Sequence, residues 1–226
     1  HRQVVVMTAP HIGNTGMNST DEESRRIWVA GYVVREPARI ASNWRSQRTL
    51  EDDLVEAGVV GISRIDTRAL TRHLRDKGAM RVGISTVDTD PTSLLRKVVA
   101  SPGMAGANLV ADVTTSHPYV VPAQGTKRFT VAALDLGIKG MTPEQMARRG
   151  IEVHVMPASS TYADLMAVNP DGIFLSNGPG DPSTADHAVK VTREALAART
   201  PVFGICFGNQ ILGRALGFST YKLKFG

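Results

Sequence analysis

The sequence predicts an α/β protein in which a mixed α/β amino-terminal domain precedes a domain built on a parallel sheet. Its length of 226 residues is long for one domain and comfortable for two. Residues 116–128 carry turn-forming residues without an apolar period, so we expect them to link domains at 1–115 and 129–226. After this linker, short apolar runs alternate with amphipathic segments. That alternation is typical of parallel strands joined by right-handed crossovers, with helices on both faces of the sheet.

The first domain is expected to hold short strands and capped helices. Residues 49–58 begin with a threonine N-cap and acidic residues and end with a glycine, which is the pattern of a helix. Residues 66–75 repeat that layout. Further strands are expected at residues 4–7, 28–34 and 81–85, and a further helix at residues 91–99.

The second domain is more regular. Four apolar strands are expected at residues 130–134, 152–156, 172–176 and 201–205, and helices at residues 142–149, 162–168, 185–198 and 207–216. Glycine-rich turns follow two of these strands, at residues 178–180 and 204–208. Because ligands of such sheets bind at the carboxyl ends of the strands, we expect the functional site at these two turns.

Composition excludes several classes of protein. Hydrophobic residues make up 42% of the chain and charged residues 21%, as in folded globular domains. No apolar run approaches the roughly 20 residues of a membrane helix, and we expect a cytoplasmic protein without a membrane partner. The net charge of +5 arises from basic residues interleaved with acids, and aromatic residues are only 5% of the chain, so no nucleic-acid partner is expected. The single cysteine excludes an internal disulfide and a cysteine-rich zinc site.

That cysteine, Cys206, lies in the most informative stretch of the chain. Residues 204–208 read Gly-Ile-Cys-Phe-Gly, the pattern of a nucleophile on a sharp strand-to-helix turn. The amino end of the following helix favours a thiolate, and backbone N–H groups after the nucleophile can stabilise an oxyanion. From spacing alone, a structural cysteine at a glycine-rich helix start is an equally good interpretation.

Longer stretches resemble known families. Residues 203–210 resemble the nucleophile motif of the triad-type (class I) glutamine amidotransferases, and residues 175–182, Leu-Ser-Asn-Gly-Pro-Gly-Asp-Pro, resemble their glutamine-site loop. Residues 1–5, 10–14 and 61–68 are similar to the amino-terminal domain of carbamoyl-phosphate synthase small chains. The matches extend over nearly the whole chain, and the amino-terminal ones distinguish it from other amidotransferases.

The resemblance implies roles for particular residues. Cys206 would attack the side-chain amide of glutamine, giving a glutamyl thioester and ammonia. The N–H groups of Phe207 and Gly178 would form the oxyanion hole, and Gly180 and Gln210 would help to hold the substrate. The glycines would act through their backbones, so valine at position 178 is expected to block glutamine use without unfolding the chain.

The resemblance also implies a partner. Ammonia would pass through a tunnel into the large subunit of carbamoyl-phosphate synthase, which uses ATP and bicarbonate to make carbamoyl phosphate for pyrimidine and arginine biosynthesis. The amino-terminal domain, which has no catalytic constellation, is expected to dock that subunit in a heterodimer. No cofactor or metal is expected in this chain, because ATP and metal ions would belong to the large subunit.

A thiol nucleophile also needs a general base and a carboxylate that orients it. The resemblance implies a His and a Glu well downstream of Cys206, but all six histidines lie upstream of it. His154 and His187 are expected to be structural residues. The substrate-binding serine of the family would lie just before His1. We therefore expect both domains to be truncated relative to the family, and the 226-residue chain alone to be inactive with glutamine.

Two other functions remain open from the sequence. One is a catalytically silent scaffold that regulates a large partner, and the other is a free-standing cysteine hydrolase. Minor motifs favour neither: residues 177–182 lack the Lys-Ser/Thr of a phosphate-binding loop. Asp135, in a strand-to-helix connection, has no assigned role, and the acids at residues 21–23 are expected to form a solvated loop rather than a metal site.

Overall fold

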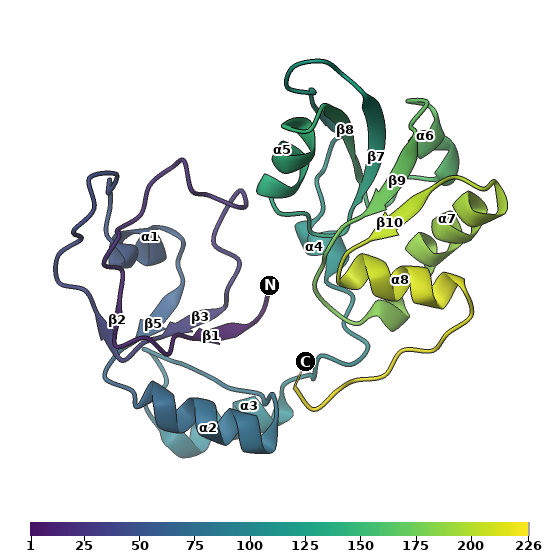
Figure 1. Ribbon diagram of the computed structural model, residues 1–226. Helices are drawn as coiled ribbons and strands as arrows, with labels where there is room; N and C mark the ends of the chain where they lie inside the picture. The colour runs from purple at the N-terminus through teal and green to yellow at the C-terminus, as the bar shows by residue number, and fades with distance from the viewer. Residues whose placement is uncertain (226) are drawn as a thin grey trace. The chain divides into compact units, whose positions relative to one another are not determined.

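A computed structural model describes residues 1–225 and divides the chain into two compact units (Figure 1). Unit 1 comprises residues 1–103 together with the residues from Lys222 onward, and unit 2 comprises residues 104–221. The division thus lies before the stretch 116–128 that the sequence suggests as a linker. Residues 104–128 belong to unit 2 and include helix α4 (Val110–Val113) and strand β6 (Tyr119–Val121). Both elements are too short to show an apolar period in the sequence.

Unit 1 is built on a small parallel sheet. Its strand order is β1 (Val4–Val6), β3 (Gly31–Val33) and β5 (Val60–Ile62), and a separate two-stranded sheet pairs β2 (His11–Ile12) with β4 (Glu36–Pro37). Helices α1 (Leu50–Glu56), α2 (Thr67–Lys77) and α3 (Pro91–Ala100) complete the unit. All three helices begin one residue after a capping Thr or Asp side chain, which confirms the helices that the sequence predicts there.

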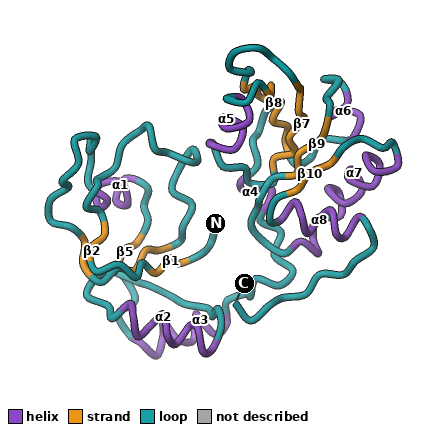
Figure 2. The backbone as a smooth tube through the Cα atoms, viewed as in Figure 1, coloured by secondary structure: helices purple, strands orange, loops and turns teal. Residues whose placement is uncertain are grey.

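One strand predicted in this unit is wrong. Residues 81–85 pair with no strand of the described part of the chain, residues 1–225, and appear as loop between α2 and α3 (Figure 2). The Arg81 guanidinium donates to the carbonyl oxygens of Val99 and Ser101, at 2.8 and 2.5 Å. A Cβ at Gly83 would lie 2.8 Å from Val98. Arg81 and Gly83 therefore hold this segment against α3, while Val82 is 55% exposed.

Unit 2 has a five-stranded sheet in the order β10-β9-β7-β8-β6. Strands β7 (Phe129–Asp135), β8 (Ile151–Pro157), β9 (Gly172–Leu175) and β10 (Val202–Gly204) are parallel, and only the edge strand β6 is antiparallel. Helices α5 (Met141–Ala147), α6 (Tyr162–Met166), α7 (Asp186–Ala197) and α8 (Phe207–Ala215) alternate with these strands, and a 3₁₀ turn, η1 (Pro182–Thr184), precedes α7. The predicted alternation and parallel sheet are confirmed.

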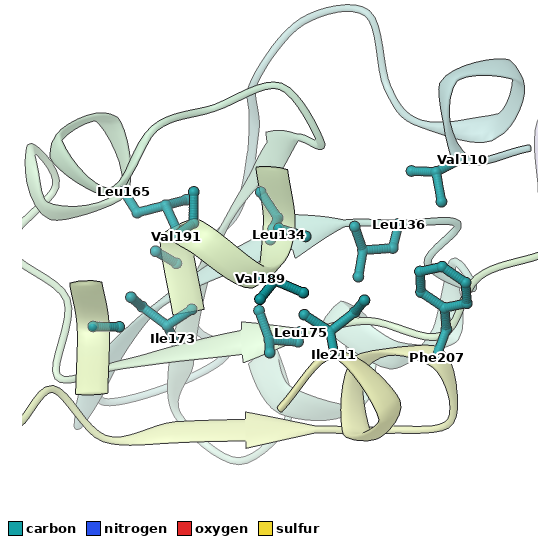
Figure 3. Close-up of a cluster of buried hydrophobic side chains, with 13 residues drawn as sticks. Val110, Leu134, Leu136, Leu165, Ile173, Leu175, Val189, Val191, Phe207 and Ile211 are labelled. Atoms are coloured by element: carbon teal, nitrogen blue, oxygen red, sulfur yellow. The ribbon is translucent and has the colours of Figure 1, made fainter. Parts of the chain in front are cut away.

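Helices cover both faces of this sheet. Successive residues of a strand point to opposite faces, so Ala132 and Leu134 join one hydrophobic cluster while Ala133 joins the other. The larger cluster packs the sheet against α6, α7 and α8 (Figure 3), and the smaller one packs it against α5 through Met146. None of the helices within residues 1–225 combines the length and the apolar character that crossing a membrane requires.

Candidate active site

Cys206 lies on a strained turn at the carboxyl end of β10. It separates the end of that strand, at Gly204, from the start of α8, at Phe207, and its side chain is exposed. Its backbone angles are φ 55° and ψ −113°. A positive φ is uncommon for a residue other than glycine, and such strain persists only where the surrounding structure imposes it. The turn thus holds a thiol in the open at the amino end of a nine-residue helix.

The two glycines beside the cysteine allow this turn by close approach of backbones. A Cβ at Gly204 would lie 2.6 Å from the carbonyl carbon and oxygen of Gly208. A Cβ at Gly208 would lie 2.1 Å from the carbonyl oxygen of Leu175, at the end of β9. Any side chain at either position would force the strand, the helix or the neighbouring strand to move. The sequence-based expectation of a sharp, glycine-dependent turn is therefore confirmed.

Backbone hydrogen bonds join the turn to the loop that follows β9. The N–H of Ile205 donates to the carbonyl oxygen of Leu175 at 3.1 Å, and the N–H of Gly208 donates to that of Ser176 at 3.0 Å. The side chain of Phe207 is 2% exposed and packs in the larger hydrophobic cluster, which anchors the first turn of α8. The Cys206 turn and the loop after β9 therefore lie at the same edge of the sheet.

The loop after β9 carries the two glycines singled out in the sequence. A Cβ at Gly178 would lie 2.2 Å from the carbonyl oxygen of Leu136. Gly180 has a φ of +95°, and a Cβ there would lie 2.6 Å from the carbonyl oxygen of Ala107. Within residues 1–225, the N–H groups of Gly178 and Phe207 donate to no protein acceptor. Two backbone donors are thus available at this edge of the sheet.

Gln210 lies one helical turn beyond Cys206. Its N–H donates to the carbonyl oxygen of Cys206 at 3.1 Å, and its side chain is exposed. Gln210 therefore lies close in the chain to the thiol, at the first complete turn of α8.

Asp135 has a structural role that the sequence does not indicate. Its side chain is buried and accepts hydrogen bonds from the N–H groups of Thr115, Gly137 and Ile138, at 2.6, 2.9 and 2.8 Å. These bonds fix the loop after β7.

A second set of bonds ties that loop to the one carrying Gly178. The N–H of Leu136 donates to the Ser176 hydroxyl at 2.9 Å, and the Asn177 amide donates to the carbonyl oxygen of Gly137 at 2.8 Å. The loops after β7, β9 and β10 thus form one connected edge of the sheet.

Asp181 anchors the far side of the glycine loop. Its carboxylate accepts from the N–H of Gly106 and from that of Ser183, each at 2.8 Å, and its own N–H donates to the carbonyl oxygen of Ala107 at 2.9 Å. These hydrogen bonds, that of Gly106 foremost, hold the pKa of the Asp181 carboxyl below its ordinary value.

The two histidines of unit 2 considered in the sequence have other partners. His154 Nε2 lies 3.0 Å from a carboxylate oxygen of Glu152, and His187 Nε2 lies 2.9 Å from the carbonyl oxygen of Ser160. In unit 1, Asp21 accepts from Asn18 and Arg45, both at 2.8 Å. No group of three or more His, Cys, Asp or Glu side chains arranged to hold a metal ion occurs in the part of the chain that the structure describes.

Two family models match the chain. The model described as carbamoyl-phosphate synthase small chain, CPSase domain, matches residues 1–84, and the model of class-I glutamine amidotransferases matches residues 132–226. The second match contains Cys206, Gly178, Gly180 and Gln210.

Relatives named carbamoyl phosphate synthase small chain align with the whole of this chain. That of Streptomyces avermitilis is 69% identical, with 60% of its own length covered, and that of Streptomyces coelicolor is 67% identical with the same coverage. That of Mycobacterium tuberculosis is 59% identical, with 62% of its length covered. The chain thus spans about 60% of the length of these curated relatives. With a small-chain domain followed by a class I glutamine amidotransferase domain, it belongs to the family of carbamoyl-phosphate synthase small chains.

Proposed function

We propose that this protein, in its full-length form, hydrolyses glutamine and supplies the ammonia to the large subunit of carbamoyl-phosphate synthase. The observation that carries the proposal is the exposed thiol of Cys206 on a strained turn at the amino end of α8. Beside it lies a loop in which the N–H of Gly178 has no acceptor among residues 1–225. The glutamine amidotransferase match and the names of the relatives support the same role.

The chemistry begins at the sulfur. The Cys206 thiolate attacks the side-chain amide carbon of glutamine, forming a C–S bond and a tetrahedral intermediate with a negatively charged oxygen. The backbone N–H groups at the amino end of α8 carry partial positive charge and lie next to this sulfur in the chain. Collapse of the intermediate breaks the C–N bond and, with a proton delivered to nitrogen, releases ammonia. Water then hydrolyses the thioester, which gives glutamate and restores the thiolate.

Backbone donors stabilise the intermediate. We assign the oxyanion to the N–H groups of Phe207 and Gly178, which donate to no protein acceptor within residues 1–225. Such pre-oriented donors are worth about 10²–10³-fold in kcat each. Gly180 and Gln210 would hold the remainder of the glutamine, the first through its backbone and the second through its exposed side chain in the first turns of α8.

The proton transfers need a general base. His154 contacts Glu152 and His187 contacts the Ser160 carbonyl oxygen, and these contacts argue against either histidine as the general base. The family resemblance implies a His oriented by a Glu from further along the relatives' longer chains. We therefore propose that the 226-residue chain alone is inactive with glutamine, since general acid–base steps contribute typically about 10²–10⁴-fold.

The partner would be the large subunit, which would use the ammonia, ATP and bicarbonate to make carbamoyl phosphate for pyrimidine and arginine biosynthesis. We propose that unit 1 docks it. Large apolar side chains stand exposed on loops of this unit, with Trp44 at 91% and Ile40 at 78% exposure. Contiguous exposed apolar patches mark interaction surfaces, and we propose that these two side chains belong to one. Trp44→Ser in the full-length protein should weaken co-purification with the large subunit, and undiminished binding would argue against this surface.

The function itself is tested by one substitution in the full-length protein bound to the large subunit. Cys206→Ser should abolish carbamoyl phosphate synthesis from glutamine and spare synthesis from added ammonia. An equal loss of both rates would mean that Cys206 is structural. Unchanged rates with both nitrogen sources would favour a catalytically silent scaffold.

A further inference from the structure

Arg214, in the last turn of α8, reaches out of its helix to the loop that carries the two glycines. Its guanidinium donates from Nη1 to the carbonyl oxygen of Pro182 at 2.8 Å, and from Nη2 to a carboxylate oxygen of Asp186 at 2.8 Å. The Arg214 side chain is 22% exposed. One guanidinium therefore joins α8 to the 3₁₀ turn η1 and to the first residue of α7.

Two contacts from α8 hold the glycine loop, residues 176–182, and we call this pair of contacts the clamp. At the start of the loop, the N–H of Gly208 in the first turn of α8 donates to the carbonyl oxygen of Ser176. At the end of the loop, Arg214 in the last turn of the same helix holds Pro182. Gly178 and Gly180 lie between these two points in the chain. The helix that presents the Cys206 thiol thus also holds both ends of the loop that faces it.

We propose that Arg214 is a positioning residue for the glutamine site, and this inference rests on the proposed function of Cys206. Arg214 acts through Pro182 to set the distance between the glycine loop and the nucleophile helix. The bond to the Pro182 carbonyl carries most of the effect, because it is charge-assisted and partly buried. Asp186 is 83% exposed, so its ion pair with Arg214 contributes little.

The chain offers a matched control in Arg193. This residue of α7 donates from Nε to the carbonyl oxygen of Ala215 at 3.2 Å and from Nη2 to that of Arg214 at 3.3 Å. It therefore gives two hydrogen bonds and one positive charge to the same end of α8. Within residues 1–225, neither of these hydrogen bonds involves the glycine loop. Loss of Arg193 removes support from the helix end without removing the clamp.

The experiment uses the full-length protein with its large subunit and compares Arg214→Met, Arg214→Lys, Arg193→Met and Cys206→Ser. Arg214→Met should raise the KM for glutamine by about tenfold, the typical effect of losing one charge-assisted hydrogen bond. Arg214→Lys can still donate to Pro182 but cannot form the two-pronged contact, so its KM should lie between those of the wild type and Arg214→Met. Arg193→Met should stay within about twofold of wild type. Ammonia-dependent synthesis should be unchanged in all four.

A second readout separates positioning from general damage to the helix. The rate at which iodoacetamide alkylates Cys206 should be the same in Arg214→Met and wild type, while higher glutamine concentrations should be needed to protect the thiol. Equal KM changes in Arg214→Met and Arg193→Met, or no change in Arg214→Met, would overturn the inference. If Arg214→Met does not fold, the Arg214→Lys comparison decides in the same way. Glutamine-dependent synthesis that survives in Cys206→Ser would instead refute the proposed function.

Discussion

Replacing Gly178 by alanine should destabilise unit 2, because its Cβ would lie 2.2 Å from the carbonyl oxygen of Leu136. Contacts below 3.0 Å are essentially never made by real Cβ atoms, so the loops after β7 and β9 must separate by at least 0.8 Å, the difference of those two distances. That movement strains the Ser176 and Asn177 hydrogen bonds between the loops, at about 0.5–1.5 kcal/mol each, and adds an overpacking cost of about 1–3 kcal/mol. The expected loss of unfolding free energy is about 2–6 kcal/mol.

The assay is urea unfolding of the protein followed by circular dichroism, with Gly213→Ala as the matched control. Gly213 lies on α8 with nothing within 4 Å of its Cβ position, so alanine there should stabilise the helix by up to about 1 kcal/mol. A Gly178→Ala midpoint equal to that of wild type would refute the close approach of the two loops. The sequence suggests that valine at position 178 would leave the fold intact. Since the larger valine side chain would meet the same carbonyl oxygen of Leu136, we expect Gly178→Val to lower the free energy of unfolding as well.

Three further predictions follow from the site. The Phe207 side chain is 2% exposed, so Phe207→Ala should lower the free energy of unfolding by about 3–5 kcal/mol in the same urea assay. A loss below about 1 kcal/mol would contradict the role of Phe207 in anchoring the first turn of α8. Since the pKa of Asp181 is lowered in the fold, its carboxylate stabilises unit 2 at pH values above about 3.9, its unfolded value, and that stability is lost as the pH falls through the folded pKa. The difference in urea stability between wild type and Asp181→Asn should therefore shrink on acidification below about pH 4, and a constant difference would argue against the anchor. His187→Gln in the full-length protein should leave glutamine-dependent turnover within about twofold of wild type, whereas a loss of 10²-fold or more would make this histidine the base.

The parts of the fold that the sequence predicts well are those with local causes. Helix α1 begins after Thr49, whose side chain accepts from the N–H of Asp52, and helix α3 begins after Asp90, which caps it in the same way. In the same manner, the two glycines of residues 204–208 are enough to predict the sharp turn at Cys206. A capping side chain or a turn glycine acts within a few residues of itself, so the sequence pattern contains the whole interaction.

The parts that the sequence misses depend on distant partners. Strand β6 has three residues and owes its place to antiparallel pairing with β8, so the stretch around it resembles a linker. The apolar residues at 81–85 suit a strand and a segment packed on a helix equally well. At the site, Asp181 contacts Gly106 across 75 positions and Arg214 contacts Pro182 across 32. No local motif signals either contact, and only the folded chain brings the partners together.

Acid-quench mass spectrometry of the full-length protein with its large subunit tests the central claim most directly, because it detects the glutamyl thioester itself. During turnover with glutamine, the peptide that contains Cys206 should carry a glutamyl group, and treatment with hydroxylamine should remove it. The Cys206→Ser protein should show no such adduct under the same conditions. A steady-state rate of ammonia release from glutamine with no acyl group on Cys206, or with an acyl group on another residue, would contradict the account.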